Sequence, residues 1–205
     1  KNVKSIIVPS FRSLHVWDYK KINSKSDLNN TDFKVLVSLP ISLVMSKTIL
    51  KLLISFNTRI ENSLNNQIFF IKAHPAFKSD KDFDKLSTQL SENFIFKNNE
   101  DFNSLLFDSN LLISEASGTC LEAIASGVPA LVIKSTKGLF YNPIPDDIPS
   151  FMFRIVSNVD DIYKQIHFYH NNNSTHQNEL IKCSKKVRLK YFEPYNKKVI
   201  NNFIK

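Results

Sequence analysis

The sequence predicts an α/β domain of three layers, in which a mainly parallel sheet of about six strands lies between two layers of helices. From about residue 32, short runs rich in β-branched and aromatic residues alternate with longer stretches of helical periodicity. The length of 205 residues suits one domain with a sizeable core. No apolar run approaches the roughly 18 residues of a membrane span, so we expect a soluble chain or one attached only at a membrane surface.

Six apolar runs are expected to be strands, because turn or polar residues bound each of them. They are Phe33–Ser38, Ile68–Ala73, Phe94–Lys97, Leu111–Ser114, Ala130–Lys134 and Phe153–Val156. The stretches between them have helical periodicity. They are Ser42–Leu64, Asp80–Ser91, Asp101–Phe107, Thr119–Ser126 and Val159–His170, followed by a terminal helical region from Asn178. Asn171–Asn173 predicts a polar break, and Lys137–Pro149, with three prolines, predicts a long ordered loop.

The first helical stretch has basic residues among its apolar ones. The apolar set at near-helical spacing is Leu43, Ile49, Leu50, Leu53, Phe56, Ile60 and Leu64, and the basic set is Lys47, Lys51 and Arg59. A helix lying on a membrane surface has this pattern. Because such a stripe is more often the inward face of a core helix, we expect a core face here.

Residues 1–30 do not join the alternation of strands and helices. Ser5–Val8 is compatible with one strand, and an aromatic segment and a polar linker follow it. We interpret residues 1–30 as the tail of a preceding domain with a linker, and residues 31–205 as the main domain with its C-terminal helices. The chain begins at Lys1 and shows no signal-peptide pattern, so we expect an internal piece of a longer polypeptide.

The net charge of +8 suits anionic ligands: nucleoside diphosphates, acidic polysaccharide, anionic lipid headgroups or nucleic acid. Basic residues cluster modestly at Lys182, Lys185, Lys186, Arg188 and Lys190. Nucleic acid is the least expected partner, because the sequence has no recognised binding motif and no basic stripe interleaved with aromatics.

Cys120 and Cys183 match no disulfide or metal spacing, so we expect two reduced, buried thiols in a cytoplasmic protein.

The three glycines of the chain lie close together, although average usage of about 7% would give roughly fourteen. They are Gly118, Gly127 and Gly138. A composition that avoids glycine keeps it where backbone geometry requires it. Gly127 is expected to follow the end of a short helix as a C′ glycine, before Val128 and Pro129 lead into the next buried strand.

A candidate anion site follows the strand that ends at Ser114. The chain turns there through Ser117, Gly118 and Thr119 into a helix, whose first N–H groups and dipole favour an anion. Gly118 lets a phosphate approach the backbone, the hydroxyls of Ser117 and Thr119 can donate, and Glu122 can accept from ribose hydroxyls. The alternative is a plain helix cap, with Ser or Thr at the N-cap and Glu122, three residues after Thr119, completing a capping box; the local sequence favours neither reading.

A second candidate lies at Lys72-Ala73-His74-Pro75, at the end of another expected strand. Pro75 disfavours helix at His74 and leaves the imidazole at the strand tip. Ligands of open parallel sheets bind beyond the carboxyl ends of the strands, so His74 and Ser117 could flank one ligand. A donating His74 could stabilise the charge on a departing phosphate, and a structural histidine is the alternative.

These two motifs suggest a family. Ser117-Gly118-Thr119 with Leu121-Glu122, followed by Gly127-Val128-Pro129, resembles the C-terminal domain of GT-B glycosyltransferases, including lipid A disaccharide synthase. The Lys-x-His-Pro strand end is similar to the pattern of bacterial sialyltransferases and capsule polysaccharide transferases. Residues 10–19 look like a junction segment of bacterial surface-carbohydrate biosynthesis proteins. The resemblance covers roughly residues 32–170 and is strongest over about 20 residues.

The resemblance implies a Rossmann-like domain, the C-terminal half of a GT-B fold. It implies a phosphate site of Ser117, Gly118 and Thr119, with Glu122 at the ribose and His74 near the phosphate or the base. We expect Ser114 and Lys72 beside the phosphate, and His74 to be the catalytic residue that stabilises the leaving group. The donor would be a UDP- or CMP-linked sugar, and no other cofactor is expected. The acceptor would be a surface polysaccharide or a lipid-linked acceptor, bound with the help of an N-terminal domain.

Two features depart from the pattern of the family or limit it. The loop Ser38–Ile41 has no glycine, which puts a phosphate contact from it in doubt. No Asp-x-Asp motif appears, so we expect no metal.

The resemblance implies a cytoplasmic enzyme, at the inner face of the membrane if it has a peripheral membrane contact. A nucleotide-sugar epimerase of the related fold and a noncatalytic module of a polysaccharide assembly complex remain open alternatives.

Overall fold

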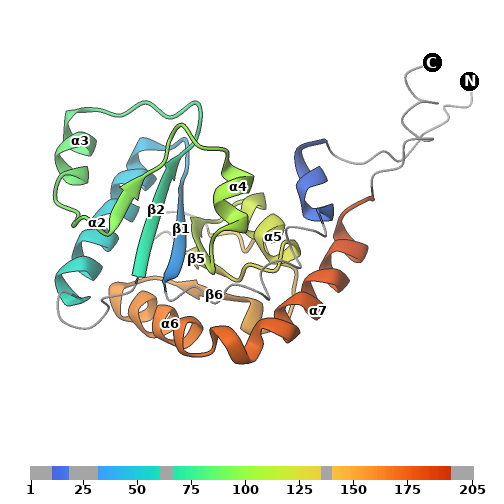
Figure 1. Ribbon diagram of the computed structural model, residues 1–205. Helices are drawn as coiled ribbons and strands as arrows, with labels where there is room; N and C mark the ends of the chain where they lie inside the picture. Colours follow the sequence, from blue (N-terminus) through green and yellow to red (C-terminus); the bar gives the residue numbers. More distant parts are fainter. Residues whose placement is uncertain (1–10, 19–31, 61–66, 135–139, 195–205) are drawn as a thin grey trace, which may run out of the picture.

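Six parallel strands form the sheet of the computed structural model, which describes residues 11–18, 32–60, 67–134 and 140–194 (Figure 1). The strands are β1 Phe33–Leu39, β2 Gln67–Ala73, β3 Phe94–Phe96, β4 Leu111–Glu115, β5 Ala130–Ile133 and β6 Phe153–Val156. Their order is β3-β2-β1-β4-β5-β6, and each neighbouring pair is parallel. The six predicted strands and the predicted parallel sheet are confirmed.

The helices are η1 Phe11–Trp17, α2 Leu43–Ile60, α3 Lys81–Ser87, α4 Phe102–Phe107, α5 Gly118–Ala125, η3 Ser150–Met152, α6 Val159–Asn171 and α7 Asn173–Tyr191. The last helix begins at Asn173, so the predicted start at Asn178 is wrong. The predicted polar break Asn171–Asn173 is reduced to the single residue Asn172 between α6 and α7. The side-chain amide of Asn172 donates to Phe168 O at 2.8 Å, and its backbone carbonyl accepts from His176 N at 3.0 Å, so Asn172 joins the two helices directly.

The helix α3 is shorter than predicted. It ends at Ser87 rather than Ser91, and Thr88 is its C-cap. The following residues turn back toward the sheet, where the N–H of Phe69 donates to Asn93 O at 2.8 Å. The end of the helix is therefore set by the pairing of β3 with β2.

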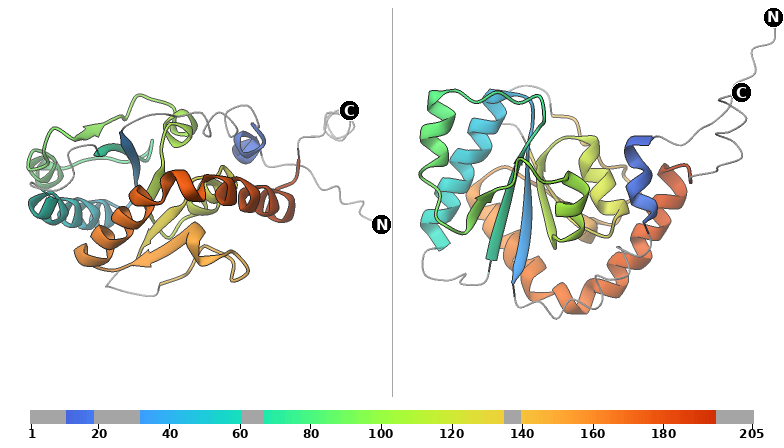
Figure 2. Two further views of the ribbon diagram at one scale, coloured as in Figure 1. Left: turned by 60° about the horizontal axis from the view of Figure 1, so that its bottom comes forward. Right: turned by 45° about the horizontal axis from the view of Figure 1, so that its top comes forward.

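Each face of the sheet carries its own hydrophobic core. Side chains of α2, α3 and α6 belong to the core of one face, and side chains of α4, α5, α7 and η1 belong to the core of the other. Figure 2 shows the ribbons of these helices around the sheet. Ile49, Leu50, Leu53 and Phe56 of α2 are fully buried, which confirms the predicted core face of this helix. The predicted strand Ser5–Val8 lies outside the described residues.

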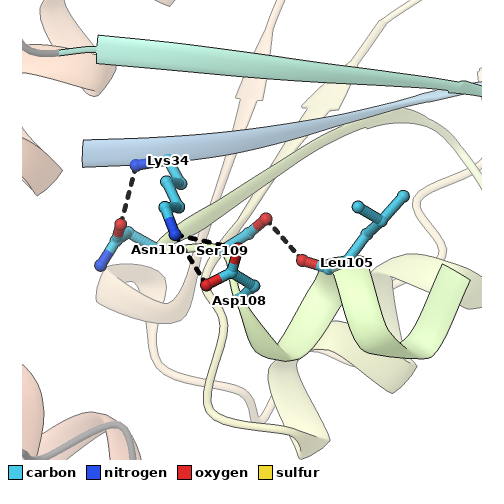
Figure 3. A network of polar contacts seen from close by, with 5 residues as sticks. All are labelled: Lys34, Leu105, Asp108, Ser109 and Asn110. Carbon is cyan, nitrogen blue, oxygen red and sulfur yellow. Dashed lines mark hydrogen bonds and ion pairs between the residues drawn. The ribbon is translucent and has the colours of Figure 1, made fainter. Parts of the chain in front are cut away.

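Polar contacts join the end of α4 to the start of the sheet (Figure 3). The side-chain carbonyl of Asn110 accepts from Lys34 N at 2.8 Å, and the N–H of Asn110 donates to Lys34 O at 2.8 Å. Lys34 Nζ lies 2.8 Å from a carboxylate oxygen of Asp108, and Ser109 Oγ donates to Leu105 O at 2.7 Å. These contacts hold β4 in register beside β1.

The loop before β6 is described from residue 140 onward. Ile144 and Ile148 are buried in the core of the second face, and the N–H of Ile148 donates to Pro145 O at 3.1 Å. The loop is thus packed against the domain. Gly138 lies outside the described residues.

Both cysteines are free thiols. Cys120 is buried, and burial raises the pKa of its thiol to about 12, whereas Cys183 is only half-buried. In the part of the chain that the structure describes, no helix has the length and apolar character needed to cross a bilayer.

Candidate functional site

A cavity of about 610 Å³ opens at the carboxyl ends of β1, β2 and β4, beside the first residues of α4 and α5. The strand order reverses between β1 and β4, because successive strands lie to opposite sides of this point. Open parallel sheets bind their ligands at such a point. The cavity therefore lies where the fold favours a ligand.

The structure brings all seven predicted site residues to this cavity. They are Lys72, His74, Ser114, Ser117, Gly118, Thr119 and Glu122. Three strands contribute to it, of which β1 and β4 begin 78 residues apart in the sequence, at Phe33 and Leu111, and parallel pairing aligns their ends. Their arrangement around one cavity follows from the sheet, while their role in binding stays a prediction.

A row of polar residues crosses the sheet beneath the cavity. Ser38 pairs in register with Lys72 on one side and with Ser114 on the other. Two residues earlier in each strand, the same face of the sheet carries apolar side chains: Leu36, Phe70 and Leu112. Because side chains on one face recur every second residue, the core of this face ends in polar groups at the cavity.

The turn into α5 is capped by Ser117. This residue is extended, with φ −151° and ψ 152°, and its Oγ accepts from Thr119 N at 3.1 Å. The hydroxyls of Ser117 and Thr119 are also hydrogen-bonded to each other. The helix is therefore capped by a serine, as the alternative reading expected. With Ser117 as the N-cap the capping-box position falls on Cys120, so the capping box of Thr119 with Glu122 is wrong.

Gly118 is the first residue of α5 and is exposed in the cavity. A Cβ added there would meet no atom within 4 Å, and among the described residues only Gly127 has a positive φ. Neither crowding by the protein nor backbone strain therefore requires glycine at this position. A side chain would take up cavity space beside the first N–H groups of the helix, which have no helical partner. Gly127, with φ 78°, follows the C-cap as predicted.

His74 follows β2 at the rim of the cavity. The backbone N–H of His74 donates to Leu39 O at 3.0 Å, which fixes the backbone of His74 beside the end of β1. The N–H of Ala76 donates to His74 Nδ1 at 3.1 Å, so this nitrogen is an acceptor. The neutral ring then carries its proton on Nε2, which can donate to a ligand.

Lys72 brings a positive charge to the cavity. The residue is 9% exposed, and its Nζ donates to Asn98 O at 2.9 Å. No ion pair of Lys72 is recorded among the described residues. A buried cation without a carboxylate partner favours an anionic ligand.

Two carboxylates also line the cavity. Glu122 is buried and accepts from Ser13 Oγ of η1 at 3.3 Å, so residues far apart in the sequence meet there. Glu115 ends β4, and its partial burial raises the pKa of its carboxyl. Both groups can accept hydrogen bonds from the hydroxyls of a ligand.

The first residues of α4 line the cavity too, although the sequence interpretation did not include them. Asp101 is the N-cap and accepts from Ser104 N at 2.8 Å, which places Phe102 and Asn103 at the start of the helix. An aromatic residue directly after a capping aspartate, at the expected carboxyl edge of the sheet, was the available signal. Pro40 and Ile41 of the glycine-free loop after β1 are further lining residues.

Across the described ranges, no group of three or more His, Cys, Asp or Glu side chains is arranged to hold a metal ion. No protein-family model matches the sequence, and no curated protein sequence matches it significantly.

The fold resembles that of several solved proteins that act on sugars. A spinosyn rhamnosyltransferase complexed with thymidine diphosphate matches 88% of this chain over 47% of its own, with 16% identity and a TM-score of 0.57. A UDP-GlcNAc 2-epimerase from Neisseria meningitidis, bound to UDP-GlcNAc, matches 87% of this chain over 51% of its own, with 17% identity and a TM-score of 0.53. The chain spans about half the length of these two proteins.

A third match is the catalytic domain of a cholesterol-α-glucosyltransferase from Helicobacter pylori. It covers 74% of this chain and 97% of that domain, with 17% identity and a TM-score of 0.50. At such low identity the likeness concerns the fold alone. The chain therefore has a Rossmann-like α/β/α fold that matches one half of a GT-B protein, a fold shared by glycosyltransferases and UDP-GlcNAc 2-epimerases.

Proposed function

We propose that this chain is the donor-binding domain of a metal-independent glycosyltransferase and that its cavity holds the nucleoside diphosphate of a nucleotide-sugar. The observation that carries the proposal is the meeting of Lys72 with the N-terminus of α5 in one cavity at the strand-order reversal. A cation and a helix start both favour an anion, and Gly118 leaves room for one.

The polar residues predicted from the sequence, together with Phe102, have separate roles in this proposal. The first turn of α5, with the hydroxyls of Ser117 and Thr119, binds phosphate, and Lys72 adds charge with Ser114 beside it. Glu122 accepts from the ribose. Phe102 offers an aromatic face to the base.

His74 is the proposed catalytic residue. As the sugar leaves, negative charge builds on the departing phosphate, and the Nε2–H of His74 can donate to it. An acceptor hydroxyl attacks the sugar carbon while the bond from that carbon to the phosphate oxygen breaks. The acceptor, a surface glycan or a lipid-linked glycan, and the base that takes its proton would belong to an N-terminal domain.

The proposal extends to the whole enzyme. Residues 1–30 would be the tail of the preceding domain and its linker, and residues 31–205 the donor domain. The donor would be UDP- or CMP-linked, and the enzyme would work in the cytoplasm, at the inner face of the membrane.

The test is a calorimetric titration of the chain with UDP, CMP and GDP, in the wild type and in Gly118→Val. One nucleotide is expected to bind, and the valine is expected to weaken it at least about tenfold, because it takes up the space of a phosphate. Ser55→Val, on the exposed side of α2, is the matched control for a valine at a helix surface. A Gly118→Val protein that is folded by circular dichroism and keeps its affinity would sink the proposed phosphate site.

A nucleotide-sugar epimerase is the second candidate, favoured by Glu115 in the cavity and by the likeness to the Neisseria meningitidis epimerase. Such an enzyme needs carboxylates close to the sugar. Product analysis separates the two candidates, because an epimerised sugar would replace the glycoside. Detection of that sugar would decide against the transferase.

A further inference from the structure

The outward face of α7 carries a basic stripe, which we define as Lys182, Lys185, Lys186, Leu189 and Lys190. All five residues are exposed, and helical spacing brings them to one side of the helix. The opposite side is buried, with Leu180, Ser184, Val187 and Arg188. Figures 1 and 2 show α7 running along the outside of the domain.

The charges of the basic stripe are largely uncompensated. Lys190 pairs with Asp147 at 2.8 Å, whereas no ion pair of Lys182, Lys185 or Lys186 is recorded in the described part of the chain. No acidic residue occurs from Leu180 to Phe192, although Glu179 and Glu193 flank the stripe. Three neighbouring ammonium groups are therefore available to an anionic partner.

The helix that carries the stripe is held firmly against the domain. The guanidinium of Arg188 is buried and donates to the carbonyl oxygen of Ala125 in the last turn of α5 and to Ser184 Oγ. Val187 and Leu180 belong to the hydrophobic core of this face of the sheet. The stripe is thus a preformed surface, which needs no folding step before it binds.

Leu189 distinguishes a membrane from other anionic partners. Its side chain is 66% exposed, and lysines lie on both sides of it around the helix. An apolar side chain among lysines gains free energy when it enters the lipid headgroup region, while the lysine stems extend beside it. Nucleic acid gives no such gain. The aromatic residue next to the stripe is Tyr191, whose ring lies under Lys190 Nζ at 5.3 Å and whose hydroxyl is hydrogen-bonded to Asp147, so its ring is already engaged.

We propose that the basic stripe of α7 binds a membrane surface that contains anionic lipids. Ammonium groups attract the negative leaflet, and Leu189 inserts between the headgroups. This proposal does not depend on nucleotide binding at the cavity, which is lined by other elements.

The test is co-sedimentation of the full chain with phosphatidylcholine vesicles, either pure or containing about 30% phosphatidylglycerol. The wild type is expected to bind the anionic vesicles and not the neutral ones. The triple variant Lys182→Glu, Lys185→Glu, Lys186→Glu is expected to bind at least about 100-fold more weakly, because each of the three lysines contributes about fivefold. Leu189→Ser is expected to lose about three- to tenfold on the same vesicles.

The matched control is Lys51→Glu, Lys81→Glu, Lys85→Glu, which makes the same charge change on exposed residues of α2 and α3. Equal losses in both triple variants would overturn the proposal, because net charge alone would then explain binding. Absence of binding to anionic vesicles, or equal binding to neutral ones, would overturn it as well. Tighter binding to single-stranded DNA, lost in the stripe variant and kept in Leu189→Ser, would assign the stripe to nucleic acid instead. Unfolding curves verify that each variant is folded.

Discussion

Lys72 and Glu115 bring opposite charges to one cavity. Lys72 favours an anionic ligand, whereas an ionised Glu115 repels one. Partial burial raises the pKa of the Glu115 carboxyl, because the charged form is less well solvated there. The carboxyl of Glu115 therefore loses its charge at a higher pH than an ordinary glutamate does, and the net charge of the cavity changes with it.

We expect Glu115→Gln to bind a nucleoside diphosphate about two- to fivefold more tightly than the wild type at pH 8, because one repulsive charge is removed. The difference should shrink as the pH falls through the raised pKa of Glu115, where the wild-type carboxyl takes up a proton and becomes neutral as well. Titrations at several pH values between about 5 and 8 check this. Glu92→Gln, an exposed position away from the cavity, is the control. A constant difference at every pH would show that the glutamate charge is not responsible.

At the scale of elements, the carboxyl ends of β1 and β4 line the cavity together only if the two strands stay in register. The opposite ends of these strands are joined by the two hydrogen bonds between Asn110 and Lys34, and the ion pair of Lys34 with Asp108 lies beside them (Figure 3). The side chains of this ion pair are 17% and 47% exposed. Water therefore screens the ion pair, and the hydrogen bond to Lys34 N is the more important contact.

Asn110→Ala is expected to lower the free energy of unfolding by about 1–2 kcal/mol, because Lys34 N loses its acceptor. Asp108→Asn, which removes only the ion pair, is expected to cost less than about 1 kcal/mol. Urea denaturation of both variants measures the difference. The interpretation fails if Asp108→Asn is the more destabilising change.

At the scale of the whole molecule, the cavity exists only in the folded chain. Its walls come from three strands and two helices, and Glu122 meets Ser13 across a long stretch of sequence. A nucleotide that binds this cavity must therefore stabilise the fold as a whole.

We expect a bound nucleotide at about one hundred times its Kd to raise the free energy of unfolding by about 2.7 kcal/mol. The effect should persist with a metal chelator present, because Lys72 and the start of α5 supply the positive charge. Thermal unfolding with and without nucleotide measures it. At the same nucleotide concentration, the tenfold weaker binding expected of Gly118→Val should reduce the gain to about 1.4 kcal/mol or less. A stabilisation that disappears with the chelator would contradict the proposed metal independence.

Local sequence determined most of the elements of this protein. The run Ile68–Ala73 is short and rich in β-branched and aromatic residues, which favours a strand, and the spacing of Leu50 and Leu53 suits one helix face. The turn at Ser117 and the C′ role of Gly127 also follow from local chemistry, because capping and a positive φ restrict the residue types allowed.

Only the tertiary structure decided the strand order, the end of α3 at Ser87, and the place of Phe102 and Ser13 beside the candidate site. Each of these depends on contacts between residues distant in the sequence, which local propensity does not encode. The motifs around Lys72 and Ser117 were readable one at a time. Their meeting in one cavity is a property of the sheet, because β1 pairs with both of their strands and aligns the strand ends.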